Sequence, residues 1–150
     1  MKLHQDLRLM SIDPGENSGF AAHMVGDPIK GMLSWHGFYS HDQFFNQLAM
    51  MNPDVIICES FDHRAKDNIN YTPIEYIGLV ILYVERRYVE RRPVELVFQT
   101  PSFGKSFGID RLKKLGLYIA GADNTDQMMA LRHMLQFLIS QEAFDFGLLK

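Results

Sequence analysis

Apolar residues recur along the chain with two different periods, and the alternation of these periods predicts the order of strands and helices. Three short runs near the N-terminus are separated by turn-forming Gly, Pro, Asn and Asp, a pattern typical of an antiparallel meander of strands. They cover residues 7–13, 19–25 and 31–38. Residues 54–59 (DVIICE) and 93–99 (PVELVFQ) predict a fourth and a fifth strand. The fourth run is apolar enough to be buried on both faces.

Longer segments place apolar residues three or four positions apart, which is typical of amphipathic helices. The first (SHDQFFNQLAMM) opens on Ser40, an expected N-cap, with Gln43 three residues later in the capping-box pattern. The second (TPIEYIGLVILYVERRYVERR) opens on Thr72, its expected N-cap, followed by Pro73 in the first helical position. We expect this long helix to end before Pro93.

The C-terminal part of the chain is predicted to hold a loop with one short helix, residues 100–121, and a final amphipathic helix, residues 123–141. The complete order, βββαβαβα, predicts an α/β fold in which helices flank a mixed five-stranded sheet. At this length and with 47% hydrophobic residues, the chain is expected to form one domain over residues 1–150.

Composition and charge indicate the environment of the protein and the kind of partner it could bind. The single cysteine, Cys58, lies inside an apolar strand and is expected to be a buried thiol in a reducing, cytoplasmic environment. We expect neither a signal peptide nor a membrane span, because no apolar run is long enough. The net charge is −3, yet basic residues outnumber acidic ones in residues 60–114, where a polyanion could dock. Part of this charge, in VERRYVERR, equally suits a solvated helix face with internal Glu–Arg pairs.

A carboxylate stands at the end of the first predicted strand, where the chain turns at Pro14 and Gly15. Burying the charge of Asp13 there costs free energy unless a cation or hydrogen bonds compensate it. The same residues also suit an ordinary turn, in which Asp caps, Pro presets φ and Gly takes a positive φ. Glu59 ends the fourth strand in the same way. If the first and fourth strands are neighbours, both carboxylates lie at one edge of the sheet.

Two more acids, Asp123 and Asp126, stand three residues apart at the start of the last predicted helix and would share one face of it. Aspartate at a helix N-terminus is also favoured by the helix dipole alone. Four converging carboxylates would suit Mg²⁺, which takes hard oxygen ligands and leaves positions for water and substrate phosphate. Two such ions side by side are suited to phosphoryl displacement, the chemistry of a metal-dependent nuclease.

Four segments in their order along the chain carry a resemblance to a known family: SIDPGENSGFA, PDVIICES, TPIEYIG and GADNTDQMMALRHML. Together they resemble the RuvC family of Holliday junction resolvases, within the RNase H-like superfamily, and most closely its small phage-encoded members. The resemblance implies a homodimeric endodeoxyribonuclease that nicks branched DNA symmetrically with Mg²⁺, for which Mn²⁺ would substitute. The implied catalytic residues and metal ligands are Asp13, Glu59, Asp123 and Asp126.

One departure from the family concerns the last acidic motif. Small phage members often carry His-x-x-Asp before an Arg-His pair, and an alignment on Arg132-His133 places Met129 at the final acid. The alternative register pairs Asp123 with Asp126, and we favour it because Gly121 breaks the chain just before and Asn124 is a suitable N-cap. His133 itself is interpreted as a packed or surface residue.

Phosphate contacts are expected from basic residues near the acids: His63, Arg64, Lys66 and Lys105. The apolar run IGLVILYV of the long helix would supply either a dimer face or core.

An alternative function is a catalytically weak or silent module that binds branched DNA on the same fold. A less favoured alternative is an actin-like ATPase, which needs two such domains. Four-way junctions, flaps and forks all remain open as substrates.

Overall fold

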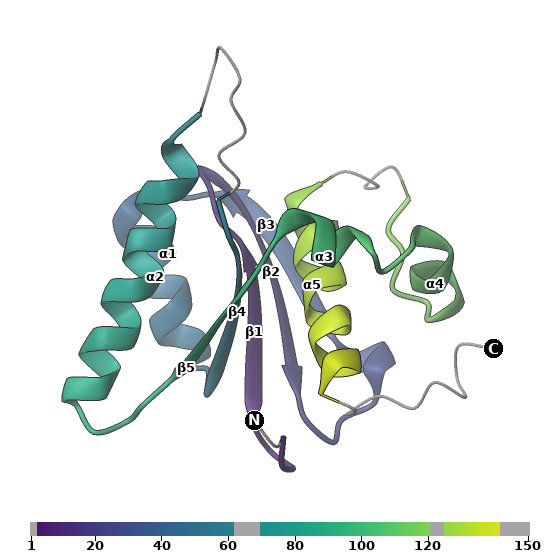
Figure 1. The fold of residues 1–150 in the computed structure, drawn as a ribbon, viewed down its shortest axis with the longest axis horizontal. Coiled ribbons are helices and arrows are strands. Elements are labelled where there is room, and N and C mark those ends of the chain that lie inside the picture. The colour runs from purple at the N-terminus through teal and green to yellow at the C-terminus, as the bar shows by residue number, and fades with distance from the viewer. Residues whose placement is uncertain (1–2, 62–69, 121–124, 142–150) are drawn as a thin grey trace.

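A mixed five-stranded sheet forms the centre of the computed structural model, which describes residues 3–61, 70–120 and 125–141 (Figure 1). The strands are β1 (Arg8–Asp13), β2 (Asn17–Met24), β3 (Leu33–Phe38), β4 (Val55–Glu59) and β5 (Glu95–Gln99). Their order in the sheet is β3-β2-β1-β4-β5. The first three are antiparallel, whereas β4 runs parallel to β1 and β5 parallel to β4. The predicted meander and mixed sheet are confirmed.

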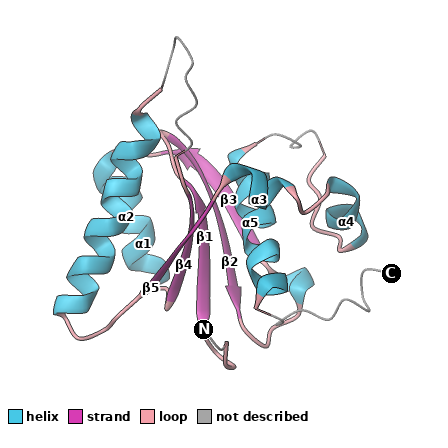
Figure 2. Ribbon diagram, in the orientation of Figure 1, coloured by secondary structure: helices cyan, strands magenta, loops and turns pink. Residues whose placement is uncertain are grey.

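Helices cover both faces of this sheet (Figures 1 and 2). On one face lie α1 (His41–Met51) and α2 (Thr72–Val89), and on the other lies α5 (Asp126–Ser140). The short helices α3 (Pro101–Lys105) and α4 (Ile109–Lys114) stand beside α5. A single 3₁₀ turn, Ile29–Gly31, precedes β3. The predicted α/β layout is confirmed, except that two short helices occupy the segment where one was predicted.

Local capping explains where the helices begin. The predicted capping box of α1 is present, because Ser40 accepts from the Gln43 amide and the Gln43 side chain accepts from the Ser40 amide. In α2 the predicted N-cap is wrong by one residue, since Thr72 is already helical and its amide donates to the Asn70 side chain. The last helix begins at Asp126 with Thr125 as N-cap, because the Thr125 hydroxyl accepts from the Met128 amide.

The side chains of each strand point alternately to the two faces of the sheet, and each face has its own hydrophobic core. Leu9, Val55, Ile57 and Val97 face α5, whereas the residues between them face α1 and α2. Cys58 belongs to the second group and is fully buried, as predicted. Successive side chains of a strand point to opposite faces of the sheet. The strand-end residues Asp13, Glu59 and Gln99 are an even number of positions from these α5-facing residues, so they point to the same face.

Among the described residues, no helix is both long and apolar enough to cross a membrane.

Candidate functional site

Three carboxylates meet at one edge of the sheet. Asp13 is the last residue of β1 and Glu59 the last of β4, and the parallel register pairs the residues just before them, Ile12 with Cys58. Asp126 begins α5, on the face toward which both strand ends point. The charges of Glu59 and Asp126 both act on Asp13, and the Asp13 and Asp126 carboxyl groups are hydrogen-bonded. The structure therefore brings together three of the predicted site residues.

A glycine allows α5 to begin at this place. Gly19 on β2 is the register partner of Asp13 on β1. A Cβ built on Gly19 would lie 2.0 Å from the carbonyl oxygen of Asp126 and 2.4 Å from the amide nitrogen of Gln127. Because any side chain here would collide with backbone, the first turn of α5 rests directly on β2. This close approach places the Asp126 carboxylate beside Asp13.

Burial and mutual repulsion shift the protonation of these acids. Burial is the largest cause that raises the pKa of Asp13 to about 9, followed by the charges of Glu59 and Asp126. Burial and the charge of Glu59 also raise the pKa of Asp126. Within the described segments, neither Asp13 nor Asp126 forms an ion pair with Lys or Arg. An ionised site at neutral pH therefore calls for a cation from outside the described side chains.

Glu59 has a different partner from the other two acids. Its Oε2 lies 2.7 Å from Nε2 of His133, and Nδ1 of the same ring lies 2.7 Å from Oε1 of Gln99. His133 is fully buried, so its interpretation as a packed residue is right about burial but misses the contact with Glu59. Gln99, which is not among the predicted site residues, is the register partner of Glu59 on β5. A polar residue at the end of a third parallel strand is the signal that points to it.

The three acids offer only oxygen atoms as ligands. Carboxylate oxygens from Asp13, Glu59 and Asp126 are the type of ligand that Mg²⁺ takes. Across residues 3–61, 70–120 and 125–141, however, no group of three or more His, Cys, Asp or Glu side chains has the spacing of a ready metal cluster. The described carboxylates thus fit the cation by the chemistry of their oxygens and by their shared edge of the sheet, but their spacing is not that of a closed metal site. The predicted fourth acid, Asp123, lies outside the described residues.

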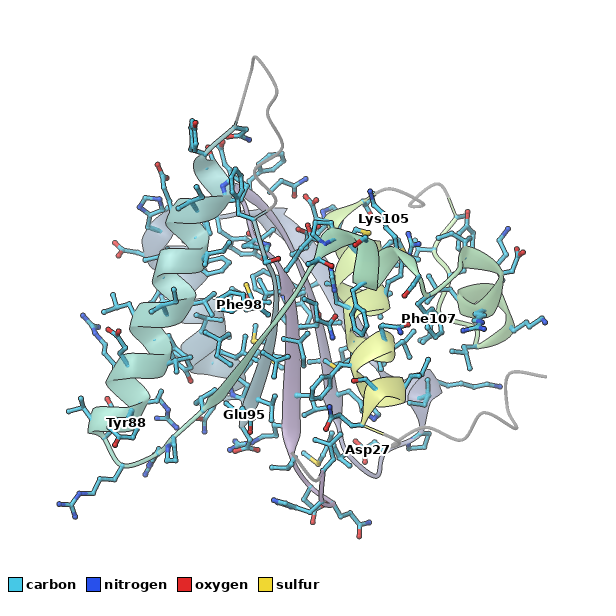
Figure 3. The ribbon with its side chains drawn as sticks, viewed as in Figure 1. Asp27, Tyr88, Glu95, Phe98, Lys105 and Phe107 are labelled. Carbon is cyan, nitrogen blue, oxygen red and sulfur yellow. The ribbon has the colours of Figure 1, made fainter. Side chains whose placement is uncertain are left out.

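The predicted phosphate contacts are only partly described. His63, Arg64 and Lys66 lie outside the described residues. Lys105 is the exposed last residue of α3, on the α5 side of the sheet (Figure 3). Its carbonyl oxygen accepts a 2.6 Å hydrogen bond from Nη2 of Arg132. The backbone that carries Lys105 is thereby tied to α5, one residue before His133.

The sequence matches no protein-family model and no curated protein. Solved structures, in contrast, share the fold over nearly the whole chain. The Thermus thermophilus RuvC bound to a Holliday junction substrate has a TM-score of 0.65 at 15% identity, covering 91% of this chain and 95% of that one. The fowlpox virus Holliday junction resolvase has a TM-score of 0.56 at 14% identity, covering 89% and 99%.

A third similar structure is the yeast mitochondrial Holliday junction resolvase, with a TM-score of 0.51 at 14% identity. The match covers 93% of this chain and 84% of that one. The chain therefore has the α/β, RNase H-like fold of the RuvC-type resolvases. At this level of identity the comparison defines the fold, and the function is argued from the site.

Proposed function

We propose that this protein is a divalent-metal-dependent endonuclease that resolves Holliday junctions and related branched DNA. The observation that carries the proposal is the convergence of Asp13, Glu59 and Asp126 at one edge of a RuvC-type sheet. Structural ion pairing is a poor explanation for this cluster, because burial and mutual repulsion raise the pKa of Asp13 to about 9. Buried acids that repel one another cost stability, and such clusters are characteristic of functional sites.

Asp13, Glu59, Asp126 and the predicted fourth acid, Asp123, would hold Mg²⁺ or Mn²⁺, with two ions per site. A bound divalent ion supplies Lewis-acid stabilisation and lowers the pKa of a water nucleophile. The protein side chains hold the ligand oxygens in place, and the parallel strands β1 and β4 fix two of them on rigid backbone. Mounting a site on strand ends keeps its geometry independent of loop motion.

Asp126 belongs to the site in either register of the last acidic motif, paired with Asp123 or with Met129. The prediction that Asp123 and Asp126 share one face of the last helix is wrong, because α5 begins only at Asp126, after the N-cap Thr125. Asp126 lies at the carboxylates, whereas Met129 is one turn further along α5 and its sulfur contacts Nη1 of Arg132 at 3.8 Å. Met129 is buried and packs beside Arg132. We keep the Asp123–Asp126 register in this proposal, because a methionine thioether is a poor ligand for Mg²⁺ and the other register would leave the site one acid short.

Basic side chains on α3, on α4 and in the segment after Glu59 would contact DNA phosphates. Lys105 on α3 is exposed, and the exposed residues Arg111, Lys113 and Lys114 follow on α4. His63, Arg64 and Lys66, just beyond Glu59 in the chain, would add contacts close to the scissile phosphate. Such contacts supply most of the affinity for DNA and make it dependent on salt.

A homodimer would provide the two active sites that symmetric nicking of a junction needs. Within the run IGLVILYV, Val80 and Tyr83 are buried in the core, whereas Ile81 and Leu82 are exposed and could contribute to a dimer face. Ile74, Ile81 and Tyr88 are exposed and seven residues apart, so they form one apolar stripe on α2. We propose this stripe as the dimer face.

The test is an incubation of the protein with a four-way junction, a linear duplex of the same sequence and ATP, each in Mg²⁺. Paired nicks in the junction, with the duplex left intact, are the expected result. Binding of the junction without nicking would overturn the nuclease and favour the silent DNA-binding module. Turnover of ATP would favour the ATPase alternative.

A further inference from the structure

His133 occupies the space between two strand ends and a short helix. On α5 it lies seven residues after Asp126, so that the two side chains share one side of that helix. Its ring bridges the end of β4, through Glu59, and the end of β5, through Gln99, with both contacts at 2.7 Å. These contacts connect residues 74 and 34 positions apart in the chain.

The chemistry of the partners determines which atom donates. An ionised carboxylate only accepts, so Nε2 of His133 carries hydrogen and donates to Oε2 of Glu59. The Gln99 amide then satisfies Nδ1 in either protonation state of the ring: its oxygen accepts from Nδ1–H, or the turned amide donates to bare Nδ1. Gln99 therefore secures the donation to Glu59 whether the imidazole is neutral or charged.

The backbone of α3 also packs closely against the ring. A Cβ built on Gly104 of α3 would lie 2.5 Å from Cε1, 2.7 Å from Nε2 and 2.8 Å from Nδ1 of His133. Gly104 is thus in direct contact with the imidazole face, and Thr100, the N-cap of α3, directly follows Gln99 in the chain. The segment from β5 to α3 thus packs against the ring, and the two hydrogen bonds hold it in the orientation that faces Glu59.

We propose that His133, held by Gln99 and Gly104, is a positioning residue that orients the Glu59 carboxylate toward the metal ion. The hydrogen bond engages Oε2 of Glu59 and leaves Oε1 for the cation. Partners of this kind fix ligand orientation, and their loss typically weakens metal binding by about 10- to 100-fold. This inference rests on the proposed function, because it assumes that Glu59 is a metal ligand.

The experiment measures Mn²⁺ affinity without DNA, by counting free Mn²⁺ with electron paramagnetic resonance. His133→Met removes the donor at similar side-chain length and should weaken binding by about 10- to 100-fold. His133→Gln keeps an N–H donor at that length and should restore most of the affinity. If His133 had only a structural role, the Gln and Met variants with equal free energies of unfolding in urea would bind Mn²⁺ equally well.

His23→Met provides the matched control, because His23 is another buried histidine, paired with Leu9 at the opposite end of β1 from Asp13. Its Mn²⁺ affinity should equal that of the wild type. If His133→Met fails to fold, Gln99→Met decides the question, and a wild-type Mn²⁺ affinity in that variant overturns the inference. Wild-type affinity in a folded His133→Met protein overturns it as well. Absence of Mn²⁺ binding by the wild-type protein would instead refute the metal site of the proposed function.

Discussion

Gly19 on β2 lies against the backbone of Asp126, the first residue of α5, so closely that a Cβ on Gly19 would be 2.0 Å from the Asp126 carbonyl oxygen. Because Gly19 is also the register partner of Asp13, this contact joins the strand end and the helix start that carry two of the acids. The close packing of a sheet against a helix terminus is therefore part of how the site is assembled.

Gly19→Ala should displace the start of α5 from β2 and separate Asp126 from Asp13. We expect a loss of about 1–3 kcal/mol in the free energy of unfolding, the usual cost of overpacking, together with loss of nicking. Urea unfolding and a junction-nicking assay measure the two effects. Gly78→Ala on α2 is the control, since nothing lies within 4 Å of its added Cβ and a helical Gly→Ala change should raise stability by about 1 kcal/mol. Equal stability of the two variants would contradict the packing argument.

Asp13→Asn and Glu59→Gln should each reduce nicking by about 100-fold or more, because each removes a charge that holds the metal ion opposite the developing charge of the transition state. Junction binding is measured by fluorescence anisotropy in EDTA. It should stay equal in Asp13→Asn, because the raised pKa already keeps Asp13 protonated without metal, and stay equal or become tighter in Glu59→Gln, since a negative charge leaves a phosphate-binding surface. Asp42→Asn, at an exposed acid in the first turn of α1, should leave both measurements unchanged. Near-wild-type cleavage by either site variant would contradict the acidic site.

Stability without metal should depend on pH through Asp13. Burial and the neighbouring acids raise its folded pKa to about 9, above an unfolded value of about 3.9. Between these values the folded state binds more protons than the unfolded state, so the free energy of unfolding decreases as pH rises from about 4 to about 9. Urea unfolding at about pH 5 and about pH 8 in EDTA checks this, and Asp13→Asn should flatten the dependence.

Adding Mg²⁺ or Mn²⁺ at the higher pH should recover the lost stability, because these ions bind ionised carboxylates of the folded state. The recovery should be absent in Asp13→Asn. If the free energy of unfolding of Asp13→Asn changed with pH as steeply as that of the wild type, another group would be the cause.

Arg132→Met should loosen the segment that carries Lys105. The guanidinium donates to the carbonyl oxygens of Phe107 at 2.8 Å and Lys105 at 2.6 Å, and Phe107 is fully buried beside α5 (Figure 3). Losing two charge-assisted hydrogen bonds should cost about 2–3 kcal/mol in unfolding free energy. Arg132→Lys should restore only part of it, because one ammonium does not reproduce the planar fork of donors. Full stability of Arg132→Met in urea would contradict this role.

The stripe on α2 predicts a dimer in solution that a single charge disrupts. Ile81→Glu should convert the dimer to a monomer, measured by light scattering after size-exclusion chromatography at about micromolar concentration, since a buried unpaired carboxylate costs several kcal/mol. Leu33→Glu is the control, because Leu33 is 62% exposed on β3, at the other edge of the sheet. A wild-type monomer that still makes paired nicks would refute the proposed dimer face.

The sequence by itself determined the elements and the placement of two acids. Alternating apolar residues predicted five strands, the Ser40–Gln43 pattern predicted the capping box of α1, and turn residues after Asp13 marked a strand end. These signals are local: they depend on backbone preferences and periodicity within a few residues. The same locality explains the errors at helix starts, where Thr125 rather than Asn124 caps α5 and Tyr71 rather than Thr72 caps α2.

Only the tertiary structure decided the partners of the site. His133 meets Glu59 across 74 positions of sequence and Gln99 across 34. The strand ends mark Glu59 and Gln99 as polar candidates, but no local pattern shows that His133 contacts them. The two glycines likewise act through the space that a missing side chain leaves open. Gly104 makes room for the His133 ring and Gly19 for the start of α5, and both of these neighbours come from distant segments of the chain. The period of a strand determines which face a side chain takes, but the side chain it meets there depends on how the sheet and α5 pack, because close packing joins residues by shape rather than by sequence distance.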